Sequence, residues 1–249
     1  MLKILRADFY KIVKSKTLLI LLIFTLLTAL TPSITMLINS STSTVLDLLY
    51  RQTMTATFMW IFIVPFVCKD FSSSYVKNLM PSYTQKDKVY YILSKLIYIF
   101  VFCVLYSIAA FIFTTILNYA FGSGTIHDEK YEAFTLGGFA LNQFAEVLNS
   151  VAIGAFIMFL CMVLKKDYFV LVIIVSYMFV FSSMIYDAIN NAILKATGDF
   201  FNYTKLYTLF GPSTATLDYN ELPIVIGMSL LYTAVFSALS WLVFRKRSY

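Results

Sequence analysis

Charged residues are scarce in this chain of 249 residues. Asp, Glu, Lys and Arg make up 13% of the sequence, about half of their share in ordinary soluble domains, whereas hydrophobic residues make up 60%. A soluble fold of this length buries a core but cannot hide so much apolar surface. The composition therefore excludes an ordinary soluble domain and predicts an all-α membrane protein.

The signatures of enzymes are also missing. The sequence contains no H-E-x-x-H motif, no nucleophile elbow and no G-x-x-x-x-G-K-[ST] phosphate loop. The single histidine, His127, stands beside Asp128 and Glu129 in a predicted external loop, where an ordinary surface role is expected. We therefore expect that the chain is not an enzyme, and that it has no catalytic residue, no metal site and no bound cofactor.

Cysteine is rare as well. Cys68, Cys103 and Cys161 all fall in or at the edge of apolar runs, and none belongs to a C-x-x-C pair. Their odd number and their membrane setting argue against a disulfide framework. The sequence predicts that all three are small buried hydrophobic residues.

Long apolar runs are what the chain does contain. A helix needs roughly 20 apolar residues to cross the hydrocarbon core of a bilayer, and six stretches meet or approach this length. The sequence predicts one membrane domain, 1–249, with membrane spans at about 18–38, 52–68, 90–121, 141–164, 168–189 and 222–244.

Lys and Arg set the expected orientation. If the N-terminus is cytoplasmic, 15 of the 19 basic residues fall in the predicted cytoplasmic segments. Both termini are then inside. The formal charge of +6 follows from these short basic loops, so it does not indicate a nucleic-acid partner.

Residues 1–16 have the pattern of an amphipathic helix at the membrane interface. Apolar residues recur at helical spacing on one face, and basic residues lie on the other, which favours burial among anionic lipid headgroups. The alternative is a positively charged flank of the first span. The apolar face consists of Leu2, Leu5, Phe9, Ile12 and Val13.

The segment 69–89 is basic and of mixed polarity, although it lies between two apolar runs. Residues 70–79 read D-F-S-S-S-Y-V-K-N-L, and residues 86–96 read K-D-K-V-Y-Y-I-L-S-K-L. With the start of the chain, A-D-F-Y-K-I-V-K-S-K at 7–16, and the predicted topology, this segment resembles the ABC-2 type exporter permease family. Two departures are visible: Ser74 replaces a common glycine, and lysine replaces an arginine in the basic pair.

The resemblance implies that a short cytoplasmic helix in this segment couples the chain to an ATPase. The family binds ATP and Mg on a separate ATPase subunit, present in two copies, and pairs two permease copies as a homodimer or a related heterodimer. A solvated basic loop that only orients the protein is the alternative. The expected coupling residues are Asp70, Phe71, Ser74, Val76, Lys77, Asn78, Leu79 and Met80.

The implied function is export across the bacterial plasma membrane. Small Gram-positive permeases of this family move bacteriocins or cytolytic amphipathic peptides such as phenol-soluble modulins, often as self-immunity. Two alternatives stay open. One is a permease for a drug or a lipid-linked molecule, and the other is a membrane anchor or sensor that transports nothing.

Polar groups in the spans are candidates for the substrate pathway, because ionisable residues inside a membrane usually serve a function. Hydrogen bonding between helices and positions at the membrane boundary are the competing explanations. The candidates are Gln52, Thr53, Thr55, Met59, Glu146 and Asp187.

An outer gate is expected between spans five and six, where similar permeases have short re-entrant helices. Aromatic residues are frequent in this part of the sequence. An interfacial aromatic belt is the alternative for them. The gate candidates are Phe201, Tyr203, Tyr207 and Phe210.

Overall fold

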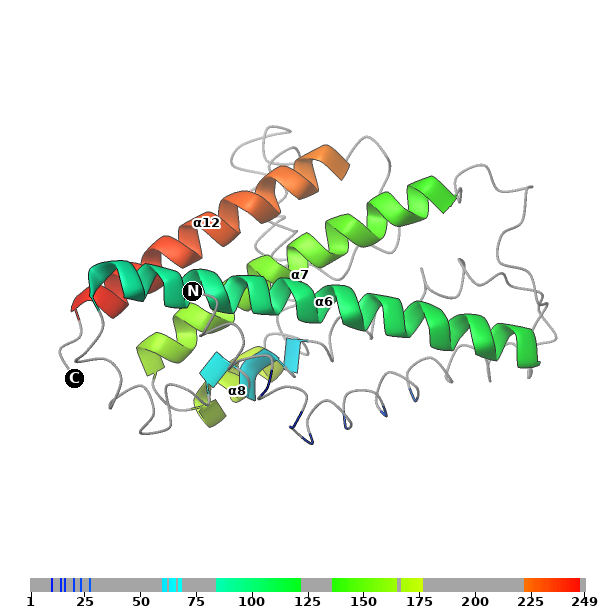
Figure 1. The fold of residues 1–249 in the computed structure, drawn as a ribbon, viewed down its shortest axis with the longest axis horizontal. Coiled ribbons are helices and arrows are strands. Elements are labelled where there is room, and N and C mark those ends of the chain that lie inside the picture. The colour runs from blue at the N-terminus through cyan, green and yellow to red at the C-terminus, as the bar shows by residue number, and fades with distance from the viewer. Residues whose placement is uncertain are drawn as a thin grey trace, which may run out of the picture.

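The computed structural model describes four helical ranges: 84–121, 136–164, 167–176 and 222–246, with single positions between 10 and 27 and between 60 and 68. The helices are α6 (Gln85–Phe121), α7 (Leu136–Leu164), α8 (Asp167–Ser176) and α12 (Leu222–Lys246), as Figure 1 shows. These ranges contain no strand. The all-helical class predicted from the sequence is thus confirmed for the described residues.

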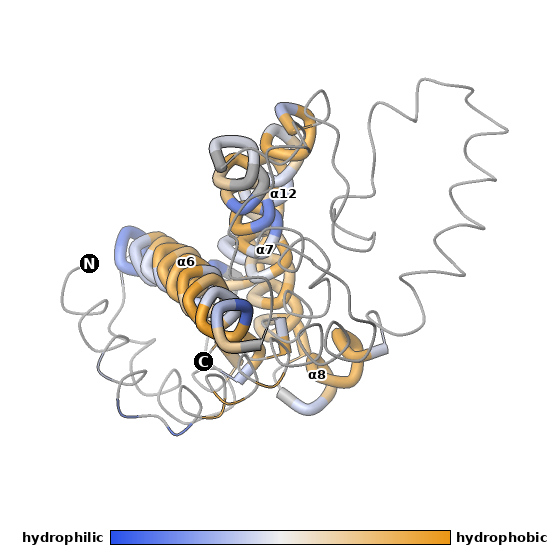
Figure 2. Tube along the Cα trace, turned by 90° about the vertical axis from the view of Figure 1, so that its right-hand side faces the viewer, coloured by the Kyte–Doolittle hydropathy of each residue, from blue (hydrophilic) through white to orange (hydrophobic). Residues whose placement is uncertain are grey.

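Three of these helices are long and apolar enough to cross a membrane. The qualifying stretches are Gln85–Ala120, Gln143–Leu164 and Leu222–Arg245. Figure 2 shows hydrophobic residues along most of α6, α7 and α12 and over α8. Six spans and an interfacial helix at 1–16 stay predictions, because most of residues 1–83 and 177–221 lie outside the described ranges.

Helix α6 begins at Gln85, five residues before the predicted span at 90–121. Thr84 caps it: the Thr84 hydroxyl donates to Oδ2 of Asp87 (2.6 Å), and the Asp87 amide donates back to the hydroxyl (3.3 Å). The Thr84 amide also donates to Oδ2 of Asp87 (3.0 Å). This reciprocal arrangement is a capping box, which satisfies amides that have no partner inside the helix. The last residues of the predicted loop 69–89 are therefore helical.

Helix α7 is the central helix of the described bundle. Within the protein, 67% of its apolar stretch is buried, against 33% for α6 and 17% for α12. Its inner face carries Ile153, Ile157, Met158 and Met162, each at most 2% exposed. The poorly covered faces of α6 and α12 are apolar, so lipid or further protein is their natural surrounding.

Contacts between side chains fix the relative directions of the helices. Along α7, Ala145 packs near the start of α12 at Leu222, and the Phe156 ring lies 5.0 Å from the Phe236 ring, so the two helices run in the same direction. The start of α6 meets the end of α12, where Tyr91 stacks on Phe244. Helix α6 therefore runs opposite to α7 and α12 (Figure 1).

The described positions between 60 and 68 join the same core. The Trp60 indole donates to the Ser150 hydroxyl at 3.5 Å, and Cys68 lies against Cys161 one turn before the end of α7. Ile63, Val64 and Val67 between them are at most 1% exposed. The described positions of this segment thus run alongside α7 and in the same direction.

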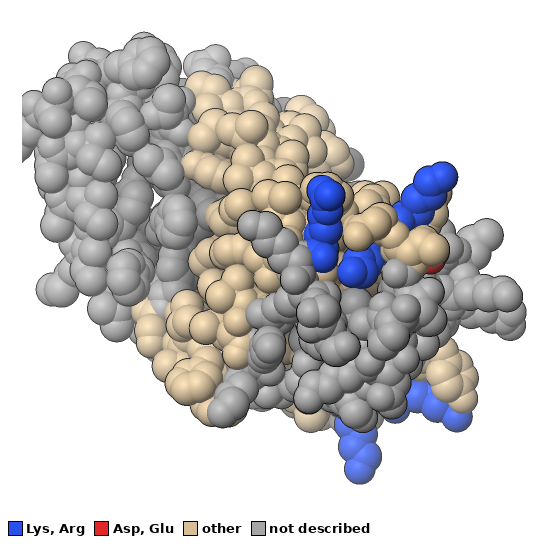
Figure 3. All heavy atoms as spheres, turned by 90° about the vertical axis from the view of Figure 1, so that its left-hand side faces the viewer, with Lys and Arg blue, Asp and Glu red and all other residues tan. Residues whose placement is uncertain are grey.

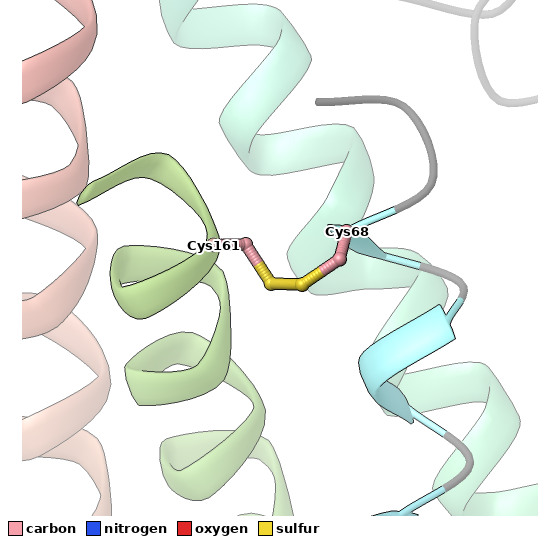
Figure 4. The surroundings of a disulfide bond; sticks show 2 residues. All are labelled: Cys68 and Cys161. Carbon is pink, nitrogen blue, oxygen red and sulfur yellow. A yellow bond between two sulfur atoms is a disulfide. The ribbon is translucent and has the colours of Figure 1, made fainter. Parts of the chain in front are cut away.

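The structure corrects one prediction about cysteine. All three cysteines are buried, as expected, but Cys68 and Cys161 form a disulfide with their Cα atoms 5.2 Å apart (Figure 4). Only Cys103 is a free thiol. The sequence could not reveal the pairing, because the two cysteines are 93 residues apart and are brought together by lateral packing of two helical segments.

Candidate functional site

Most residues predicted to carry function lie outside the described ranges. This applies to the coupling residues between 70 and 80, to the pathway candidates Gln52, Thr53, Thr55, Met59 and Asp187, and to the gate candidates between 201 and 210. The structure therefore places one of the predicted site residues, Glu146. The remaining assignments stay predictions.

Glu146 lies in the first turns of the apolar stretch of α7 and is half-buried. The side-chain amide of Gln143 donates to its Oε2 at 3.4 Å, a contact between residues three positions apart on one helix face. A carboxyl group at this depth is costly unless it is hydrogen-bonded or reaches water. The Gln143 amide supplies one such partner.

A polar stripe continues from Glu146 toward the middle of α7. Gln143, Glu146 and Asn149 recur at intervals of three, and Ser150 follows on the same side, where it accepts the Trp60 indole. Of these residues, only Glu146 is among the pathway candidates predicted from the sequence. The spacing of the amides around it is the signal that would have identified the stripe.

Two buried polar atoms lie at the same level along α7 and α12. Phe156 of α7 contacts Phe236 of α12. Asn149 lies seven residues before Phe156, and Ser229 lies seven residues before Phe236. Both are therefore roughly 10 Å along the helix axis from that contact, at the same level. In the described part of the chain, Oδ1 of Asn149 and Oγ of Ser229 have no hydrogen-bond partner. Buried polar atoms of this kind favour a polar ligand or water as a partner.

The opposite end of the bundle is basic. Lys and Arg side chains gather on the face where α6 begins and α12 ends (Figure 3). Lys88 and Lys95 are only 9% and 3% exposed, although lysine is rarely buried so deeply. In the sequence these lysines belong to the segment 86–96 and count as orientation signals, but nothing in the pattern shows that they are buried.

Two membrane-length helices, α6 and α12, pack against a third, the buried α7, and this arrangement is compatible with a helical membrane protein. No family model matches the chain, and no curated protein matches it.

Proposed function

We propose that the chain is the permease subunit of an ATP-driven exporter in the bacterial plasma membrane. It would move amphipathic antimicrobial or cytolytic peptides outward and so protect the producing cell. The observation that carries this proposal is the segment 69–89, which is polar and basic between two apolar runs and resembles the coupling segment of ABC-2 permeases. ATP and Mg bind to a partner ATPase, because this chain has no phosphate loop.

The form of α6 supports coupling through this segment. The helix begins five residues after Met80 and continues for 37 residues without a break. A displacement of the segment by a closing ATPase dimer would pass directly into α6. Helix α6 contacts α12 through Tyr91 and approaches Gly154 of α7 through Ile99, so its movement would shift the arrangement of all three helices.

The polar stripe on α7 supports a pathway. Gln143, Glu146 and Asn149 provide hydrogen-bonding groups in a mostly apolar helix, as a translocating peptide backbone requires. The exposed apolar faces of α6 and α12 provide surface for lipid and for the second permease copy. In this mechanism the pathway alternates between inward and outward access.

Purification of the tagged chain after co-expression with the ABC ATPase encoded nearest to its gene tests the proposal. The wild-type chain is expected to retain the ATPase in mild detergent. The triple variant Phe71→Ala/Lys77→Glu/Leu79→Ala should lose it, because it removes two apolar anchors and reverses one charge.

The control variant is Tyr119→Ala/Leu141→Ala. Both residues are exposed, at 61% and 52%, and lie at the end of the bundle away from the predicted cytoplasmic side. This variant should retain the ATPase. Well-folded wild-type protein that binds no ATPase would overturn the exporter proposal and favour a membrane anchor or sensor.

A further inference from the structure

Cations and aromatic rings alternate where α6 meets the end of α12. The rings of Tyr91 and Phe244 stack with centroids 5.6 Å apart and planes inclined by 18°. The Lys88 ammonium lies 5.9 Å from the Phe244 centroid, and the Lys95 ammonium lies 5.3 Å from the Tyr91 centroid. Lys88, Tyr91, Lys95, Trp241, Phe244 and Arg245 together form what we call the basic aromatic cluster.

Arg245 completes the cluster from the last turn of α12. Its guanidinium carbon lies 5.4 Å from the Trp241 ring centroid. Lys88 and Arg245 therefore lie beside the same turn of α12: Lys88 contacts the Phe244 ring, and Arg245 contacts the Trp241 ring. Both cations have a ring as a neighbour in the described part of the chain, and no ion pair joins either of them to a described carboxylate.

The nearest carboxylate along the chain does not neutralise Lys88. Asp87 accepts hydrogen bonds from the amide and the hydroxyl of Thr84, so its carboxylate takes part in the cap of α6. Lys88 is 9% exposed, and an aromatic ring compensates only part of the cost of desolvating an ammonium group. The cluster is therefore electrostatically suited to an anion.

An apolar stripe on α12 leads directly to this cluster. Leu231, Val235, Ala238 and Leu242 are exposed and recur at intervals of four, three and four, and Arg245 follows three residues later. This spacing places all five on one face of the helix. The surface thus offers an apolar strip about 17 Å long, roughly the depth of one leaflet, that ends in a positive charge.

The position of the cluster fits the edge of a bilayer. Helix α6 has 37 residues, about 55 Å at 1.5 Å per residue, against roughly 30 Å of hydrocarbon, so its ends extend beyond the hydrocarbon. Trp, Tyr, Lys and Arg are the residues that favour the headgroup region. An acidic protein surface would match the cations but not the apolar strip beside them.

We propose that this end of α6 and α12 binds an anionic phospholipid, whose phosphate lies between Lys88 and Arg245 and whose acyl chain follows the strip from Leu242 to Leu231. The lipid would join α6 to α12, the least buried of the three long helices. This proposal requires a membrane but does not depend on ATP-driven export.

Native mass spectrometry of the purified chain tests the proposal with phosphatidylglycerol and phosphatidylcholine of equal chain length. The wild-type chain is expected to retain one phosphatidylglycerol in preference to phosphatidylcholine. Lys88→Gln/Arg245→Gln should bind it roughly 30-fold more weakly, since each basic residue near an anionic surface contributes a factor of roughly five. Arg245→Gln alone, which changes an exposed side chain at a helix end, should show part of the loss.

Lys86→Gln is the matched control, because Lys86 is an exposed lysine at the same end of α6. It should retain the lipid as the wild type does. If this control and the double variant lost phosphatidylglycerol binding to the same extent, the binding would depend only on general surface charge, and the proposal would be overturned. Equal retention of the two lipids by the wild type, displacement by inorganic phosphate alone, or tighter binding of polyglutamate would overturn it too.

Discussion

Gly154 decides how closely α7 approaches α6. A Cβ atom at this position would lie 2.7 Å from Cγ2 of Ile99, and Ile99 is fully buried, so it has no room to move aside. Small residues serve this purpose between membrane helices, because association there depends on close packing. The close approach is a property of two residues from different helices, which no single-helix pattern contains.

We expect Gly154→Ala to destabilise the purified protein by about 1–3 kcal/mol, the usual cost of overpacking a close contact. Gly227→Ala is the control: a Cβ there has nothing within 4 Å, and alanine favours the helix by roughly 1 kcal/mol. Thermal unfolding in detergent measures both. In an Ile99→Ala background, Gly154→Ala should cost less than in the wild type, because the crowding Cγ2 is gone. A Gly154→Ala protein as stable as Gly227→Ala would contradict the prediction.

At the scale of elements, the long helices were predictable and their lateral packing was not. Apolar runs indicate α6, α7 and α12 because a membrane span must be apolar over its whole length. For the same reason such a run is apolar on every side, so its hydropathy does not show which face meets protein. The pairing of Trp60 with Ser150 and of Cys68 with Cys161 depends on those faces.

The start of α6 gives an element-scale prediction. Thr84→Ala removes the hydroxyl that joins the cap to Asp87, at an expected cost of about 1 kcal/mol. Hydrogen exchange of the amides of residues 85–88 should then become faster, while exchange in the middle of α6 stays the same. Thr84→Ser keeps a hydroxyl and should exchange like the wild type. Unchanged exchange in Thr84→Ala would show that the capping box does not hold the first turn.

At the scale of the whole molecule, the basic residues and the disulfide both bear on which end of the bundle faces the cytoplasm. Lys165 and Lys166 follow α7, and Lys69 follows Cys68, so the disulfide lies near the end of the bundle predicted to face the cytoplasm. Cytoplasmic proteins usually keep their thiols reduced. Orientation therefore needs a direct measurement.

We expect green fluorescent protein fused after Tyr249 to fluoresce, and alkaline phosphatase fused there to be inactive, because the C-terminus is predicted to be cytoplasmic. Phosphatase inserted at 122–135 should be active, and phosphatase inserted between Lys165 and Lys166 should not. An active phosphatase after Tyr249 would reverse the predicted topology and place the disulfide end on the oxidising side.

The disulfide also changes what a single cut in the chain can do. Because Cys68 is joined to Cys161, the intervening residues form a covalently closed ring, which contains all of α6 and nearly all of α7. Hydrolysis of any one peptide bond in that ring opens it without releasing a fragment. A protein nicked there would keep its full mass on a non-reducing gel and separate into two pieces only after reduction.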